Sequence, residues 1–272
     1  MKLRLRAAAA VASSLFASAA FAGPFILAGT DADDHGFASG GANQDGWLFM
    51  QKAIENIAAG SSLTTANRVV VSLGSSGDAL AAAQSAFNLS SLAGAGGWTF
   101  LSVTDVTAAS FASSIASAGI IMLDSGGNIG GGLTGAEEAV LTAGAAALNS
   151  FVGGGGGLFS QAGGYGWLSA LVPGLNTVTS QNTGLTLTAA GSAAFPGLNN
   201  GDLSAGPWHN YFTGVGSIPV LATGVNNFAV VIGASGGSIT DPIPAIPEPS
   251  TYALMALGLA GMAAVARRRR TT

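Results

Sequence analysis

Short, continuous apolar runs recur along this chain, and Ala-rich segments separate them. Residues 68–74 read RVVVSLG and residues 119–124 read GIIMLD, so successive side chains are apolar on both faces of an extended segment. Strands that are apolar on both faces are typical of a parallel sheet covered by helices on both sides. The chain is therefore predicted to be an α/β protein, a three-layer sandwich with a mostly parallel central sheet.

The same pattern assigns the individual elements. The apolar runs predict strands over 24–29, 68–74, 98–103, 119–124, 158–160, 185–189, 218–223 and 228–234. Helical spacing predicts helices over 47–59, 78–87, 107–117 and 134–152, the last opening on a capping box of Thr134 and Glu137. Residues 174–217 are rich in Gly, Asn and Ser and are predicted to be long surface loops.

The N-terminus has the three parts of a secretory signal peptide. A basic start (Lys2, Arg4 and Arg6) precedes an apolar stretch and an Ala20-Phe21-Ala22 cleavage site. Residues 1–22 are therefore predicted to be removed by signal peptidase after export through the inner membrane; a buried N-terminal helix is the alternative. The predicted division continues with one domain over 23–240, a Pro-rich linker over 241–250 and an apolar helix with an Arg cluster over 251–272.

The C-terminal helix is short for a membrane span. Tyr252 to Ala266 carry no charge, and a helix of that length reaches about 22 Å against a hydrocarbon core of about 30 Å. Arg267, Arg268, Arg269 and Arg270 can snorkel and would keep this end on the cytoplasmic side. The segment is predicted to anchor the chain in the inner membrane transiently.

Pro247, Glu248 and Pro249, followed by the apolar run and the four arginines, form a pattern with a known parallel. It resembles the PEP-CTERM sorting signal of Gram-negative bacteria. The resemblance implies an exosortase as partner, removal of the tail, release to the cell surface, and a setting of exopolysaccharide and biofilm production. A C-terminal anchor that is never cut is the alternative.

The charge of the exported part restricts its partners. Between residues 23 and 246, Lys52 and Arg68 are the only basic residues and twelve residues are acidic, which leaves a charge of about −10. Two cations cannot neutralise a run of phosphates, so nucleic-acid binding is excluded, as is attraction to an anionic membrane. Divalent cations and neutral glycans remain suitable partners. The chain has no cysteine, so disulfides and thiol chemistry are excluded.

The middle of the chain has a second resemblance. The segment from IIMLDSGG through LTGAEEAVLTAGAAALNSFVGGGGGLFSQAGGYGWLSALVPG is similar to class I glutamine amidotransferase-like domains, in particular the trehalose-utilisation-type branch. The resemblance extends loosely over residues 24–234 and implies a flavodoxin-like fold. Where that family places its cysteine, this chain has Ser160, Gln161 or Ala162, so the family's thiol chemistry is absent.

A serine hydrolase would need a nucleophile, a base and an orienting acid. Ser160 ends a predicted central strand, at the sheet edge where ligands of α/β folds bind. His209 could serve as base on a loop over that edge, with Asp124 or Glu137 to orient it. The alternative is that Ser160 is a small turn residue and His209 a loop residue beside aromatics.

The stretch TDADDHG at residues 30–36 is a candidate cation site. Asp31, Asp33 and Asp34 would repel each other without a compensating cation or water, and carboxylate oxygens suit calcium (Ca2+). His35 would allow a zinc-type site instead. The EF-hand pattern is met only in part, and a solvated acidic loop is the alternative.

These observations favour a binding protein over an enzyme. The first hypothesis is a non-catalytic interaction module that binds extracellular polysaccharide, a small ligand or a cation at the acidic sheet edge. The alternative is a serine-dependent or degenerate hydrolase of extracellular carbohydrate or ester, using Ser160 and His209. Four tryptophans at element boundaries are candidates for stacking on sugars: Trp47, Trp98, Trp167 and Trp208.

Overall fold

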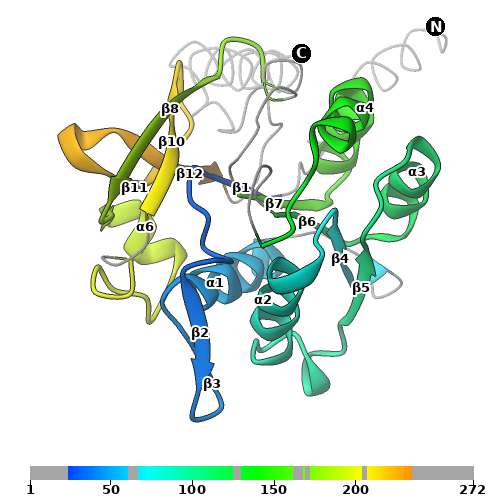
Figure 1. The fold of residues 1–272 in the computed structure, drawn as a ribbon, viewed down its shortest axis with the longest axis horizontal. Helices are drawn as coiled ribbons and strands as arrows, with labels where there is room; N and C mark the ends of the chain where they lie inside the picture. Colours follow the sequence, from blue (N-terminus) through cyan, green and yellow to red (C-terminus); the bar gives the residue numbers. More distant parts are fainter. Residues whose placement is uncertain are drawn as a thin grey trace, which may run out of the picture. The chain divides into compact units, whose positions relative to one another are not determined.

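A computed structural model describes residues 24–60, 67–124, 130–161, 168, 172–203 and 207–234. Within these residues, ten strands form one sheet with helices packed on both sides (Figure 1). The predicted signal peptide, the Pro-rich linker and the C-terminal helix lie outside the described residues. The chain divides into two units, residues 1–242 and 243–272, and the described residues all belong to the first.

Five neighbouring strands of the sheet run parallel, in the order β5-β4-β6-β7-β1. Val71 pairs with Ile121 and Leu27 with Ser160 across this part of the sheet. The prediction of an α/β sandwich with a parallel central sheet is confirmed. The strands are β1 (Phe25–Ala28), β4 (Val69–Leu73), β5 (Thr99–Val103), β6 (Ile120–Leu123) and β7 (Gly157–Ser160).

The position of β1 distinguishes this sheet from the flavodoxin arrangement. If β4 is numbered 1, β5 is 2, β6 is 3 and β7 is 4, and these strands lie side by side in the order 2-1-3-4. A flavodoxin sheet, of order 2-1-3-4-5, has the same first four places. The fifth place is taken by β1, the first strand of the chain, so the connection from β1 to β4 passes over β7 and β6. The order therefore differs from the expected flavodoxin order in the place of one strand.

Helices cover both faces of the parallel strands and form two separate cores. The helices α1 (Asp45–Gly60) and α2 (Gly77–Asn88) pack on the face that carries Ile26, Val70 and Phe159. The helices α3 (Ala108–Ser117) and α4 (Gly135–Gly153) pack on the other face. The predicted capping box is present, since the Thr134 N–H donates to Glu137 Oε2 at 2.8 Å. The layers thus follow from strands that are apolar on both faces.

The second half of the sheet is antiparallel and corrects the prediction of long loops over 174–217. This segment contains three strands and a helix, and β1 pairs with the last strand that the structure describes. The strand at the sheet edge, NTVTSQNT, carries Thr, Asn and Ser on both faces, so it has no apolar pattern by which to recognise it. The elements are β8 (Asn176–Thr183), β9 (Thr186–Leu187), α6 (Ala189–Ala194), β10 (Pro207–Thr213), β11 (Val220–Thr223), the 3-10 turn η3 (Val225–Asn227) and β12 (Ala229–Ala234).

A small hairpin precedes α1 and projects from the body of the domain (Figure 1). It consists of β2 (Gly36–Ser39) and β3 (Ala42–Gln44), and Asn43 on β3 is buried against α1 and α2. The Asn43 amide donates to Gln51 Oε1 at 2.9 Å and to the Ser85 carbonyl at 3.0 Å. The 3-10 turn η2 (Gly94–Gly96) lies between α2 and β5.

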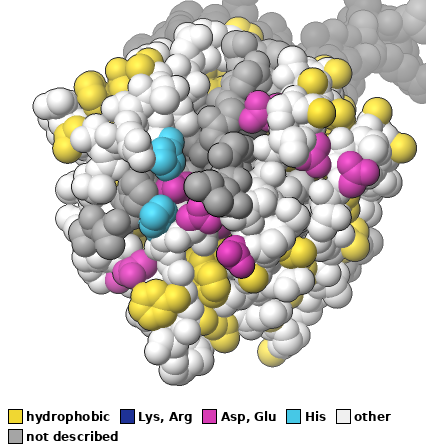
Figure 2. All heavy atoms as spheres, in the orientation of Figure 1, with side chains coloured by type: hydrophobic (Ala, Val, Ile, Leu, Met, Phe, Trp, Pro, Cys, Tyr) yellow, Lys and Arg dark blue, Asp and Glu magenta, His cyan; other side chains and the backbone are white. Residues whose placement is uncertain are grey.

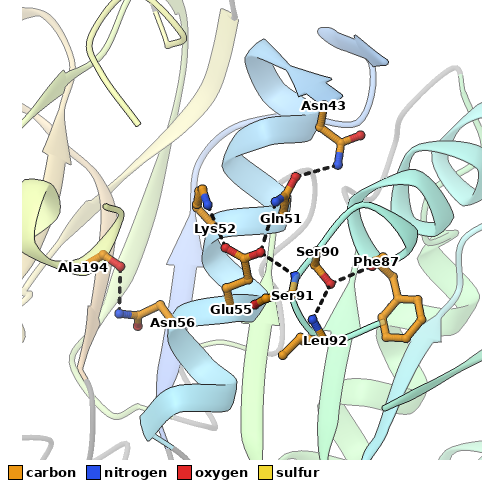
Figure 3. Close-up of polar contacts among 10 residues, drawn as sticks. All are labelled: Asn43, Gln51, Lys52, Glu55, Asn56, Phe87, Ser90, Ser91, Leu92 and Ala194. Atoms are coloured by element: carbon orange, nitrogen blue, oxygen red, sulfur yellow. Dashed lines mark hydrogen bonds and ion pairs between the residues drawn. The ribbon is translucent and has the colours of Figure 1, made fainter. Parts of the chain in front are cut away.

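A chain of polar contacts along α1 ties this helix to its neighbours (Figure 3). Glu55 accepts hydrogen bonds from Gln51 (3.1 Å), Lys52 (2.8 Å) and the Ser91 N–H (2.8 Å), and the Asn56 amide donates to the Ala194 carbonyl. Burial raises the pKa of Glu55, but these three hydrogen bonds outweigh the burial, so the pKa is lowered overall. The acid is therefore ionised and holds α1 against the segment that follows α2.

Among the described helices, none is long and apolar enough to cross a membrane. The segment predicted to do so, residues 251–272, lies outside the described part of the chain.

Candidate ligand site at the carboxyl edge of the sheet

Polar side chains collect where the parallel strands end. Asp31 and Asp33 follow β1, Asp124 follows β6 and Gln161 follows β7. All four residues are buried, although each carries a polar side chain. The carboxyl edge of an open α/β sheet is where ligands bind in such folds, so this is the candidate site.

Asp31 is the centre of the site. Its Oδ2 atom lies 2.8 Å from His209 Nε2 and 3.2 Å from His35 Nε2. The Asp31 side chain is only 8% exposed, whereas the side chains of His35 and His209 are 39% and 34% exposed. Figure 2 shows the two histidines at the surface beside acidic side chains. Asp31 is thus a buried carboxylate flanked by two partly exposed imidazoles.

The second oxygen of Asp31 has no partner. Oδ1 is buried and accepts no hydrogen bond from the described residues. A buried acceptor left without a donor costs about 1–3 kcal/mol. Such atoms are rare in folded proteins and indicate that a water or ligand supplies the missing donor.

The end of β1 and the start of β10 bring His209 to Asp31. The backbone N–H groups of His209 and Asn210 both donate to the Gly29 carbonyl, at 2.9 and 3.2 Å. The register of β10 shifts between Trp208 and Asn210, and such a bulge re-aims the side chain within it. Gly29 has to be glycine, because a Cβ there would overlap the Asn210 carbonyl oxygen.

Gln161 links β1 to the neighbouring strands. Its Oε1 accepts from the Ala32 N–H at 3.1 Å, and its Nε2 donates to Asp124 Oδ1 at 3.4 Å. The side chain therefore bridges the turn that follows Asp31 to the end of β6.

Asp124 is fully buried behind Gln161. Its Oδ2 accepts from the Ser75 hydroxyl, which lies 2.6 Å from the Ser72 hydroxyl. Burial raises the pKa of Asp124 to about 8, the negative charge of Asp33 adds to the rise, and the hydrogen bonds from Ser75 and Gln161 oppose it. Asp124 is therefore a neutral acid below that pH and contributes no charge to the site.

The predicted nucleophile and base lie on opposite sides of β1. Ser160 is 1% exposed and pairs with Leu27 on one side of that strand, while His209 bonds to Gly29 on the other. The acid at His209 is Asp31 rather than either predicted acid. Of those two, Asp124 bonds to Ser75 and Gln161, and Glu137 accepts from the Val106 N–H and caps α4.

The predicted cation ligands point to different neighbours. Asp31 and His35 contact each other, whereas Asp33 raises the pKa of Asp124 and Asp34 is exposed. In the described part of the chain, no group of three or more His, Asp or Glu side chains is arranged to hold a metal ion.

The three tryptophans that the structure describes do not form a sugar-binding face. Trp208 is fully buried in the core, and Trp47 and Trp98 pack against that core as half-buried residues. Trp47 also donates from Nε1 to the Asp33 carbonyl at 2.8 Å. Trp167 lies outside the described residues. The three described tryptophans therefore belong to the core or to its edge, which is the alternative to stacking on a ligand for tryptophans at element boundaries.

Sequence reasoning missed Gln161 as a bridging residue and the pairing of His209 with Asp31. The side chains of this pair are 178 positions apart, so no local pattern could join them. The one available signal was that an acid after the first strand and a histidine after a later loop both face the same sheet edge.

Comparison with known proteins identifies one part of the chain. Residues 245–270 match the PEP-CTERM protein-sorting motif. No curated protein and no solved structure matches the chain with significance, so the resemblance to amidotransferases gains no support from them. The motif supports an exported protein that an exosortase sorts to the cell surface.

Proposed function

We propose that residues 24–234 form a non-catalytic binding module that holds extracellular polysaccharide at the site made by Asp31, His35 and His209. The observation that carries the proposal is the buried Oδ1 atom of Asp31, which lacks a donor among the described residues. Sugar hydroxyls are donors of the required kind. The two half-exposed imidazoles beside the carboxylate offer further hydrogen bonds to a ligand that arrives from solvent.

The sorting motif gives this proposal its setting. The motif supports sorting to the cell surface, where extracellular polysaccharide would be within reach. The biofilm context is part of the proposal and rests on the resemblance of the tail to that sorting signal. Removal of the N-terminal signal peptide by signal peptidase belongs to the same proposal. The acidic exported chain, with two cations between residues 23 and 246, is poorly suited to nucleic acid.

The residues at the end of β7 favour binding over catalysis. In the amidotransferase-like domains that the middle of the chain resembles, the nucleophile comes directly after this strand. Here Gln161 is 2% exposed and its amide is engaged by the Ala32 N–H and by Asp124. We propose that the domain shares the architecture of that family without its chemistry, and the shared order of β4 to β7 is consistent with this.

A serine hydrolase is the second candidate, because His209 and Asp31 have the geometry of a base and its orienting acid at 2.8 Å. It requires that the Ser160 hydroxyl reach His209 across β1. Ester hydrolysis that is lost in both Ser160→Ala and Asp31→Asn would replace the binding proposal with this one.

The test of the proposal is a binding titration. Full-length protein in a non-ionic detergent would be titrated with oligosaccharide fragments of the polysaccharide from the producing cells, by calorimetry. Asp31→Asn keeps the shape but replaces one carboxylate oxygen by an NH2 donor, and we expect at least a tenfold loss of affinity. Asp202→Asn is the matched control, with the same change of charge in the loop between α6 and β10. Equal affinities of the two variants would overturn the proposal.

A further inference from the structure

The acidic residues of this domain are concentrated at one edge. Of the twelve Asp and Glu residues between residues 23 and 246, nine lie between the carboxyl end of a parallel strand and the first turn of the next helix. Each parallel strand except the last contributes at least one of them. They are Asp31, Asp33, Asp34, Asp45, Asp78, Asp105, Asp124, Glu137 and Glu138.

The two cations lie away from that edge. Arg68 directly precedes β4, at the opposite edge of the sheet, and donates to the Gly96 carbonyl. Lys52 lies in the middle of α1 and is paired with Glu55 at 2.8 Å. The face in Figure 2 shows histidine and acidic side chains among the described residues and no Lys or Arg. The acidic edge therefore has no cation of its own to compensate it.

Helix dipoles explain only part of this arrangement. The first-turn acids Asp45, Asp78, Glu137 and Glu138 interact favourably with the positive ends of their helices. Asp31, Asp33 and Asp34 lie in a loop that enters a hairpin, so no helix end accounts for them. Two of these three, Asp31 and Asp33, are nonetheless buried, at 6% and 3% exposure, and a buried carboxylate needs hydrogen bonds or opposite charge around it.

The unpartnered oxygen of Asp31 is the independent observation that turns the acidic edge into a site. A neutral hydroxyl would give Oδ1 its hydrogen bond but leave the charge of the edge unchanged. An ammonium group would supply both the donor and the charge, and such charge-assisted bonds are about twice as strong as neutral ones.

We infer that the ligand carries primary amines, and this inference rests on the proposed function. The site selects a glycan built of hexosamine units with free amino groups over neutral or N-acetylated glycans. The amino group binds Asp31 Oδ1, and the other ionised acids of the edge, which do not include the neutral Asp124, attract the rest of the cationic chain. His35 and His209 hold Oδ2 and thereby leave Oδ1 to the ligand.

The experiment compares two probes that differ only in acetylation. The glucosamine hexamer and the N-acetylglucosamine hexamer are titrated into full-length protein in a non-ionic detergent, at low and high salt. We expect the amino form to bind about tenfold more tightly, with a preference that shrinks as salt rises. Asp31→Asn should abolish the preference, and Asp202→Asn should keep it. Asp34→Asn is a second variant, and since Asp34 is exposed it should fold normally and reduce the preference in part.

The outcomes separate this inference from the proposed function. If both hexamers bind equally and Asp31→Asn weakens both, the ligand is a neutral glycan and the inference is overturned while the binding function stands. If neither hexamer binds but cell-surface polysaccharide does, the inference is overturned in the same way. If no glycan of any kind binds, both fail. Tight binding of spermidine with none of the glucosamine hexamer would assign the site to a free polyamine and overturn the glycan.

Discussion

The buried acid Asp124 makes a specific prediction about stability and pH. Burial and the negative charge of Asp33 raise its pKa to about 8, although the hydrogen bonds from Ser75 and Gln161 act in the opposite direction. In the unfolded chain an Asp ionises near pH 4. Neutral Asp124 therefore stabilises the fold fully below about pH 4, and this contribution is lost as the pH rises towards 8.

The magnitude follows from the linkage between proton binding and folding. Between pH 5 and pH 8 the unfolded chain has lost a proton that the folded protein keeps. The free energy of unfolding therefore falls by roughly 1.4 kcal/mol for each pH unit. Over three units the loss is about 4 kcal/mol, an upper limit because the folded acid begins to ionise near pH 8. Asp124→Asn has the shape of the neutral acid: its Oδ1 can accept from Gln161 and its Nδ2 can donate to Ser75 Oγ.

We therefore expect the advantage in stability of Asp124→Asn over the wild type to grow by up to about 4 kcal/mol between pH 5 and pH 8. Urea unfolding at pH 5, 6, 7 and 8 measures this, with the fluorescence of fully buried Trp208 as one reporter. Asp202→Asn controls for the loss of one negative charge. Parallel stability curves for wild type and Asp124→Asn would refute the reasoning, because they would mean that Asp124 is ionised in the folded protein throughout.

Two further predictions follow from local geometry, and a third follows from the predicted signal peptide and the sorting motif. Gly29→Ala should lower the free energy of unfolding by several kcal/mol, because its Cβ would push Asn210 and β10 away from β1; thermal unfolding measures it. Thr134→Ala should cost about 1 kcal/mol, since it removes the cap of α4, measured by urea unfolding. The intact mass of the protein from the cell surface should lack residues 1–22 and Arg267–Arg270; a mass that includes the arginines would indicate an uncut anchor.

The sequence predicts the parallel half of the fold well because each element there carries its own pattern. Apolar runs such as 119–124 are buried on both faces, and helices such as α4 begin with a capping box that can be recognised in the sequence. The antiparallel half lacks such signals, since β8 is polar on both faces and depends on its pairing with β10. The place of β1 in the sheet also depends on its pairing with β7 and β12, which are distant in the sequence. No local sequence pattern predicts that place.

The candidate site shows the same division. Asp31 and His209 were both predicted as site residues, one for a cation and the other for a serine nucleophile, and the structure pairs them with each other. The pairing depends on a register shift in β10 and on close contact between Gly29 and Asn210. Residue chemistry could therefore indicate which side chains matter, but only the folded sheet determines which of them meet.

The position of Gln161 at the end of β7 bears on whether the domain is an enzyme. The end of β7 is the position at which the amidotransferase-like domains present a nucleophile, so fold resemblance alone would direct attention to a catalytic residue there. In this chain the position is buried, and its amide spans from the turn after Asp31 to a neutral acid. A residue that is held by two strands can keep Asp31 aimed at a ligand but is not free to attack one. On the binding proposal, the ligand is therefore to be sought at Asp31, after β1, rather than at the end of β7.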